Sequence, residues 1–175
     1  MSSDALFAYV ASPYGFSEAG RLFYEERLIP LVERAGFAVI DPWKFSSSEL
    51  VLKAEAMPFG PDQRRFWAEA VNPVAGRINC EGIKRSHLLL GCLDGADVDS
   101  GTAGEIGFAA GLGKAIEGYR NDFRISADNI GGVVNIQVEA FVRMGGGVIS
   151  RTLDELAPRL EKRRRELHKA LKHAH

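Results

Sequence analysis

The sequence has few of the features that mark a secreted, metal-stapled or membrane-spanning protein. Its 175 residues contain two cysteines, Cys80 and Cys92, whose spacing matches no zinc or redox motif. No apolar run approaches the roughly 18 residues that a membrane-spanning helix needs. The opening residues, MSSDALFAYVASPYG, lack the basic segment and long apolar stretch of a signal peptide. We therefore expect a cytoplasmic protein in which Cys92 is a small core residue.

The sequence also lacks an excess of charge of either sign, since 22 Lys and Arg residues nearly balance 23 Asp and Glu residues. The formal net charge is −1, so no overall field attracts nucleic acid or an anionic membrane. One dense basic segment, EKRRRELHKALKH, carries glutamates and leucines at helical spacing. This pattern favours a solvated amphipathic helix at about 152–173 over an RNA- or phosphate-binding patch. We expect neither nucleic acid nor a membrane among the partners.

Phosphate-binding glycine loops and metal-ligand clusters are absent as well. GLGK at 111–114 lacks the first glycine and the following Ser or Thr of a P-loop, and GTAGEIG at 101–107 does not match G-x-G-x-x-G. No group of His, Cys, Asp and Glu has the spacing of a metal site. The sequence therefore predicts a protein without a cofactor or a bound metal.

What the sequence does contain is a regular alternation of short apolar segments and helical patterns. Its length suits one compact domain, which we expect to span residues 1–175. Short apolar strands joined by helices favour a parallel sheet with helices on both faces. The predicted fold class is α/β, a doubly wound five-stranded sheet of flavodoxin-like order 2-1-3-4-5. Strands are predicted at 5–11, 37–41, 87–93, 115–119 and 147–150, and helices at 18–35, 62–85, 101–113, 133–145 and 152–173.

Local residues predict where several helices begin, end or deform. Ser17 is a plausible N-cap of the first helix, and Gly36 a plausible stop. Pro30 could kink this helix, and Asn72-Pro73 could break the second. Residues 44–62 mix a short helical pattern with a Pro/Gly break, and we interpret them as an excursion near the site.

Ligands of doubly wound sheets bind at the carboxyl ends of the strands, near the point where the strand order reverses. This rule selects three loops, SPYGF at 12–16, DGADVDSGTAGE at 94–105 and RNDFR at 120–124. The second loop is the richest in reactive side chains, because it surrounds a run of small residues with aspartates and a glutamate.

Asp99 and Glu105 are the strongest candidates for chemistry in that loop. Asp99 or Ser100 could simply cap the helix that follows. Glu105 lies one helical turn beyond Thr102, where it can face the same crevice as the helix N-terminus. We expect the helix dipole to hold Glu105 ionised, as a nucleophile requires, while an aspartic acid could supply a proton. Paired carboxylates of this kind cleave glycosidic bonds.

Aromatic and charged residues in the other loops could each serve either ligand binding or local structure. Tyr14 and Phe16 after the first strand, and Trp43 after the second, could stack on a flat ring or pack under a loop. Asp122 could orient a substrate hydroxyl, or it could form a salt-bridged turn with Arg124.

The segments YVASPYGF, DPW, LDGADVDSGTAGEIGFAAGLGKAIEGYRNDFR and VNIQVEAF together resemble the nucleoside 2-deoxyribosyltransferase family. The similarity runs from about residue 7 to 156, and 93–124 is its most specific part. In that family a glutamate attacks the anomeric carbon of a 2'-deoxynucleoside, and a second base then attacks the covalent intermediate. The resemblance implies transfer of 2-deoxyribose between nucleobases in nucleoside salvage, with Glu105 as nucleophile and Asp99 binding and protonating the base.

The resemblance also implies roles for two asparagines. Asn79 stands where some members have an aspartate, which suggests hydrogen bonding in place of proton transfer. Asn135, in VNIQ, matches an asparagine that reaches into a neighbouring subunit's site, which implies a homo-oligomer with shared sites. The other candidate substrate-binding residues are Tyr14, Gly15, Phe16, Trp43, Asp94, Gly95, Ser100, Gly101, Thr102 and Asp122.

Two rival functions stay open. In a nucleoside or nucleotide N-glycosidase, water would resolve the same intermediate and release free base without exchange. A 5'-monophosphate substrate would need a phosphate-binding cluster, to which SPYGF is poorly suited. A non-enzymatic nucleoside sensor would bind without turnover and tolerate Glu105→Gln, and the Asp99/Glu105 pair argues against it. Base preference depends on pocket shape, which we expect residues 44–72 to set.

Overall fold

A computed structural model describes residues 5–125 and 128–173. Its centre is a five-stranded, all-parallel sheet in the order β2-β1-β3-β4-β5, which confirms the predicted topology. β5 is shorter than predicted, because only its last two residues pair with β4. The strands are β1 (Phe7–Ala11), β2 (Ala38–Ile40), β3 (Leu88–Cys92), β4 (Ala115–Tyr119) and β5 (Ile149–Ser150).

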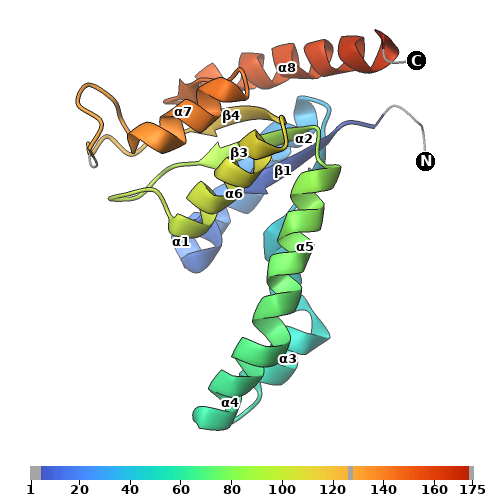
Figure 1. Ribbon diagram of the computed structural model, residues 1–175, viewed down its shortest axis with the longest axis vertical. Helices are drawn as coiled ribbons and strands as arrows, with labels where there is room; N and C mark the ends of the chain where they lie inside the picture. The colour runs from blue at the N-terminus through green and yellow to red at the C-terminus, as the bar shows by residue number, and fades with distance from the viewer. Residues whose placement is uncertain (1–4, 126–127, 174–175) are drawn as a thin grey trace.

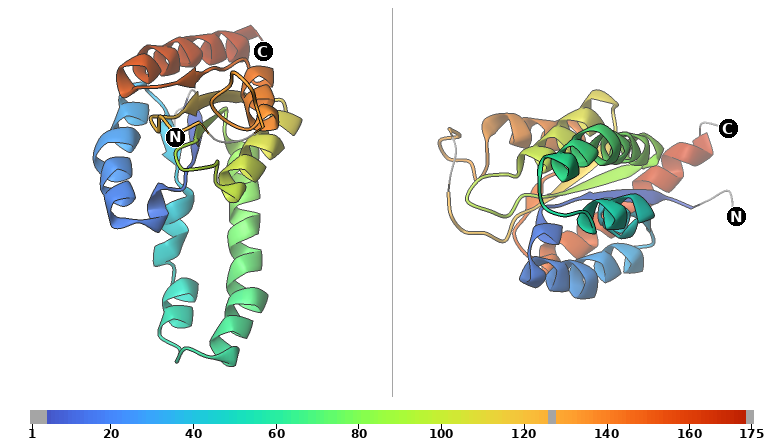
Figure 2. Two further views of the ribbon diagram at one scale, coloured as in Figure 1. Left: turned by 90° about the vertical axis from the view of Figure 1, so that its left-hand side faces the viewer. Right: turned by 90° about the horizontal axis from the view of Figure 1, so that it is seen from below.

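Helices cover both faces of the sheet, as Figures 1 and 2 show. One face packs against α1, α2 and α8, and the other against α5, α6 and α7. Side chains of β3 alternate between the two cores, since Leu88 and Leu90 join the first and Leu89 joins the second. The bounds are α1 (Glu18–Phe23), α2 (Ile29–Arg34), α5 (Asn72–Arg85), α6 (Ser100–Gly111), α7 (Ile136–Met144) and α8 (Leu153–His173).

Between β2 and α5 the chain leaves the sheet as a helical arm, which we define as residues 42–79 (Figure 1). The predicted short helix within 44–62 is present as α3, preceded by a 3-10 helix. A small separate core of Val51, Ala54 and Val71 holds the arm together. Its elements are the 3-10 helix (Pro42–Ser47), α3 (Glu49–Glu55), α4 (Pro61–Phe66), a π turn (Trp67–Val71) and the start of α5.

Two prolines lie within continuous helical stretches because each follows a π turn. Pro30 follows the π turn Tyr24–Leu28, and Pro73 follows Trp67–Val71. In each turn the amide of the residue before the proline donates to a carbonyl five residues earlier. The wider turn accommodates a ring that cannot donate to the usual carbonyl four residues back. The break predicted at 72–73 is therefore wrong, and α4 continues into α5.

The predicted ends of the first helix are confirmed, but α7 begins later than predicted. The Ser17 hydroxyl accepts from the Gly20 amide, and Gly36 has a left-handed φ of 91° just past the helix. Asn135 is the N-cap of α7, with its side-chain oxygen accepting from the Gln137 amide. The helix predicted at 133–145 was therefore too long, because an asparagine cap stops it from extending back to residue 133.

Two arginines of the basic C-terminal helix form ion pairs with a buried glutamate of the sheet. Glu117 of β4 is 1% exposed and accepts from Arg159 at 2.9 Å and from Arg163 at 3.1 Å, both on α8. The buried residues Leu156 and Leu160 anchor the same helix, and its other face is solvated. Within the described residues, no helix is both long and apolar enough to cross a bilayer.

Replacing Glu117 with glutamine is expected to destabilise the fold by about 3 kcal/mol, because two arginines lose their buried partner. For a chain of this length that loss corresponds to a fall of about 10 °C in the melting temperature. Calorimetry would measure it, with Glu161→Gln on the exposed face of α8 as the matched control. Equal melting temperatures for the two variants would contradict this account of how α8 is attached.

Candidate active site

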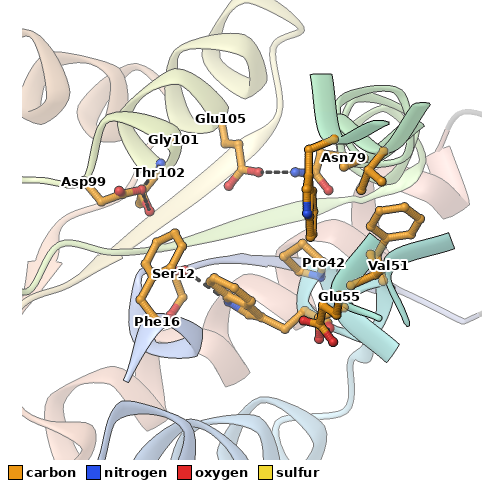
Figure 3. A pocket seen from close by; sticks show the side chains of 16 residues that line it. Ser12, Phe16, Pro42, Val51, Glu55, Asn79, Asp99, Gly101, Thr102 and Glu105 are labelled. Atoms are coloured by element: carbon orange, nitrogen blue, oxygen red, sulfur yellow. Dashed lines mark hydrogen bonds between the residues drawn. The ribbon is translucent and has the colours of Figure 1, made fainter. Parts of the chain in front are cut away.

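A cavity of about 450 Å³ lies between the carboxyl end of the sheet and the helical arm (Figure 3). Its size falls within the range of small-molecule sites. One wall comes from the loop after β1 and the first turns of α6, and the other from the arm. Seven of the predicted site residues line it, namely Phe16, Trp43, Asn79, Asp99, Gly101, Thr102 and Glu105.

Glu105 is half-buried in this cavity and is held through one oxygen. Its Oε1 accepts from the Tyr9 hydroxyl at 2.6 Å and from Asn79 Nδ2 at 3.2 Å (Figure 3 draws the second bond). Within the described residues, no hydrogen bond engages Oε2. Glu105 therefore presents one fixed oxygen to the protein and one free oxygen to the cavity.

Burial raises the pKa of Glu105, the hydrogen bond from Tyr9 lowers it, and the nearby charge of Asp99 raises it further. The net direction is upward. Within the described residues, no N–H group of α6 donates to Glu105, although the sequence analysis expected such groups to hold it ionised. Glu105 is the sixth residue of α6, beyond the free N–H groups of the first turn, so the Tyr9 hydroxyl and the Asn79 amide stabilise the carboxylate instead.

Asp99 caps α6, as the sequence predicted, and it also lines the cavity. Its Oδ2 caps α6 by accepting from the Thr102 amide at 2.8 Å and the Thr102 hydroxyl at 3.1 Å. No bond within the described residues occupies Oδ1, and Asp99 lines the cavity near Glu105. Its position is fixed through one oxygen, and the other is available to a ligand.

Aromatic side chains form the wall across from α6. Phe16 meets Trp43 edge to face, with ring centroids 4.8 Å apart. The Trp43 indole N–H donates to the Ser12 carbonyl at 3.1 Å, which fixes the ring. A Cβ on Gly15 would lie 2.1 Å from the same ring, so glycine is required for this packing.

Several predicted site residues bind one another beside the cavity. The Tyr14 hydroxyl donates to Asp94 at 2.7 Å, and Asp94 also accepts from the Asp122 amide at 2.8 Å. The Gly95 carbonyl accepts from the buried Arg120, and Asp122 forms an ion pair with Arg124. These contacts shape the loops after β3 and β4. Outside the cavity lie Tyr14, Gly15, Asp94, Gly95, Ser100, Asp122 and Asn135.

Residues within 44–72 line the cavity, as expected from the sequence, but Tyr9 and the individual arm residues were not predicted. Tyr9 lies in β1 on the face covered by α5 and α6, and its alternation with Ala8 and Val10 was the available signal. The arm adds Val51, Glu55 and Trp67. Their patterns are those of short surface helices, which carry no sign of a ligand.

The cavity lining is acidic without compensating cations. It contains the carboxylates of Glu55, Asp99 and Glu105, and none of its described lining residues is Lys, Arg or His. Within residues 5–125 and 128–173, no three His, Cys, Asp or Glu side chains come together as a metal site would require. The arrangement suits a neutral ligand that is approached by one carboxylate and contacted by another.

Comparisons with known proteins bear on the same region. The sequence matches the nucleoside 2-deoxyribosyltransferase family over residues 8–143, which includes Tyr9, Asn79, Asp99 and Glu105. Curated protein sequences gave no match.

Solved structures that share the fold include the following three. A conserved protein from Enterococcus faecalis V583 is 20% identical with a TM-score of 0.66, over 91% of this chain and 99% of that one. A 2-desoxiribosyltransferase from Leishmania mexicana is 20% identical with a TM-score of 0.60, over 89% and 97%. A CMP N-glycosidase from Clostridium botulinum is 16% identical with a TM-score of 0.53, over 89% and 98%.

Proposed function

The chain belongs to the nucleoside 2-deoxyribosyltransferase family, and we propose that it transfers 2-deoxyribose between nucleobases, in nucleoside salvage, through a covalent intermediate on Glu105. The observation that carries the proposal is the arrangement of two carboxylates in one cavity. Each is held by protein donors through one oxygen and is free at the other. One can attack an anomeric carbon while the other handles a proton on the base.

In the first step, Oε2 of Glu105 attacks C1' of the nucleoside, and the bond from C1' to the base nitrogen breaks. A base leaves poorly as an anion, so Asp99 first takes up a proton from solvent and then donates it to the base as the electron pair moves onto the base. The sugar carbon gains oxocarbenium character, which the negative charge of Glu105 stabilises before the ester bond forms.

In the second step, an incoming base gives its proton to the Asp99 carboxylate and attacks C1'. The C1'–Oε2 bond breaks, and Glu105 leaves as a carboxylate. Tyr9 and Asn79 assist this departure because both donate to the charged form. Two displacements at one carbon retain its configuration.

The lining of the cavity supports a nucleoside substrate over a 5'-monophosphate. A phosphate would enter a cavity with three carboxylates and, among its described lining residues, no cation. Repulsion between like charges in a partly desolvated site disfavours that ligand.

The proposal extends to a homo-oligomer. Asn135 lies outside the cavity of its own chain, partly exposed at the N-terminus of α7. We propose that it contributes to the site of a neighbouring copy, as the family resemblance implies.

A chromatographic assay with 2'-deoxyinosine, with and without excess adenine, tests the proposed reaction. Deoxyadenosine that forms only with adenine is the expected result. Equal release of hypoxanthine in both tubes, without deoxyadenosine, would identify an N-glycosidase, and binding without turnover would identify a sensor. A parallel reaction with the 5'-monophosphate donor is expected to be slower.

Replacing Tyr9 with phenylalanine is expected to move the acid limb of the kcat/KM profile to higher pH. The lost bond stabilises ionised Glu105, so its removal raises the pKa of Glu105 further and protonates the nucleophile at a higher pH. At pH values below the pKa of Glu105, kcat/KM of Tyr9→Phe should be about 10-fold lower than that of the unmodified protein. This factor is typical of the loss of one hydrogen bond to a charged group.

The matched control for this change is Tyr24→Phe. It removes a similar hydrogen bond, which the Tyr24 hydroxyl donates to Asp41 at 2.9 Å. Tyr24 belongs to the core on the other face of the sheet. This control should leave the acid limb in place. An acid limb that moves equally in both variants, or in neither, would contradict the role given to Tyr9.

A further inference from the structure

We infer that Glu55 selects the base, by accepting hydrogen bonds from N–H groups on the edge remote from the glycosidic bond. This inference rests on the proposed function and deepens it. It assigns the substrate class to bases such as hypoxanthine, which carries N1–H, and adenine, which carries a 6-amino group. Unsubstituted purine offers no donor on that edge.

The first support is position. Glu55 lines the same cavity as Glu105 but belongs to α3 of the helical arm, and Figure 3 shows it across the cavity from Asp99 and Glu105. The anomeric carbon must lie against Glu105, and Asp99 must reach the base close to the glycosidic bond. The remote edge of the base then extends towards the arm.

The second support is electrostatic. Glu55 is the last residue of α3, where the helix dipole disfavours a negative charge. Within the described residues, no hydrogen bond or ion pair engages its carboxylate. Glu55 is exposed, so water solvates its carboxylate in the free protein and no described protein group occupies it. A ligand N–H group can therefore reach this carboxylate without displacing a protein partner.

The third support is the surroundings of the carboxylate. Phe45, Val51 and Trp67 line the same end of the cavity on the arm. A planar base between these apolar groups displaces water, and a hydrogen bond to a charge is stronger where water is excluded. An ionised carboxylate can only accept, so it discriminates between bases by their donors.

The decisive experiment compares acceptor bases in competition. Transfer from 2'-deoxyuridine to hypoxanthine, adenine or unsubstituted purine is measured for the unmodified protein, Glu55→Ala and Glu55→Gln. The unmodified protein should prefer the donor-bearing bases, and Glu55→Ala should lower that preference about 10-fold. Glu55→Gln keeps an acceptor oxygen without the charge and should be intermediate.

Glu69→Gln is the matched control, because Glu69 is an exposed glutamate of the same arm that does not line the cavity. It should leave the preference unchanged. A preference that is equal in the unmodified protein and Glu55→Ala, with transfer intact, overturns the inference and leaves the proposed function standing.

Titration of tryptophan fluorescence with the free bases repeats the comparison without turnover, since Trp43 and Trp67 line the cavity. If no base is transferred from either 2'-deoxyuridine or 2'-deoxyinosine, the proposed function fails, and the titration alone decides the inference. Weaker binding of hypoxanthine and adenine to Glu55→Ala, with purine unaffected, would support it. Equal binding of all three bases to both proteins would refute it.

Discussion

Glu105→Ala is expected to lower the rate of base exchange by at least about 10⁴-fold and to leave the fold intact. The substitution removes the oxygen that attacks C1' and the charge that stabilises the oxocarbenium-like transition state. Glu105 is only half-buried, and its partners are one hydroxyl and one amide. The melting temperature should therefore change little compared with the loss of activity.

Two measurements separate a nucleophile from a residue that only binds substrate. Intact-protein mass spectrometry with 2'-deoxyinosine alone should show one added deoxyribosyl group on the unmodified chain and none on Glu105→Ala. Azide should partly restore cleavage by the alanine variant, because a small anion can occupy the space of the lost carboxylate. A single displacement by azide inverts the configuration at C1'.

Glu105→Gln provides the second variant, since it keeps the shape of the side chain and its contacts with Tyr9 and Asn79. It should be as inactive in transfer as the alanine variant and should not respond to azide. Exchange at an undiminished rate in either variant would remove Glu105 from the role of nucleophile. It would leave the fold and the family assignment unchanged.

The fold could be predicted closely because its signals are local and repeated. Short apolar strands such as Leu88–Cys92 alternate with amphipathic helices, and the handedness of their connections then permits few strand orders. The prolines misled the prediction at 72–73 because a π turn is set by how the helix packs, which the sequence does not display. The later start of α7 could have been predicted from the sequence, because asparagine is a favoured N-cap residue and Asn135 caps this helix.

The site could be predicted only in part, because hydrogen bonds link residues far apart in the chain. Asp99 and Glu105 lie six residues apart in one segment, and their pairing was predictable. Tyr9 contacts Glu105 across 96 positions, and this contact depends on the register of β1 against β3 and on the tilt of α6. Tyr14 and Asp94 lie in predicted site loops, but the Tyr14 hydroxyl donates a hydrogen bond to Asp94 and neither residue lines the cavity.

Asp99→Asn is expected to lower kcat for natural deoxynucleosides by about 10² to 10⁴, the usual contribution of a general acid. Asparagine caps helices as well as aspartate does, so the bonds from the Thr102 amide and hydroxyl can persist. The variant therefore removes the transferable proton while it keeps the start of α6 and the placement of Glu105. A melting temperature equal to that of the unmodified chain would show that the start of α6 is intact in the variant.

The choice of leaving group turns this substitution into a test of mechanism. The base of 7-methyl-2'-deoxyguanosine is already cationic and leaves without being protonated, so its cleavage should be much less sensitive to Asp99→Asn. For 2'-deoxyinosine the full defect should appear. If both donors lose activity by the same factor, Asp99 acts through binding or through the position of α6 and donates no proton. A large defect confined to the neutral donor would place proton transfer on the free oxygen of Asp99, because the other oxygen is committed to the helix cap.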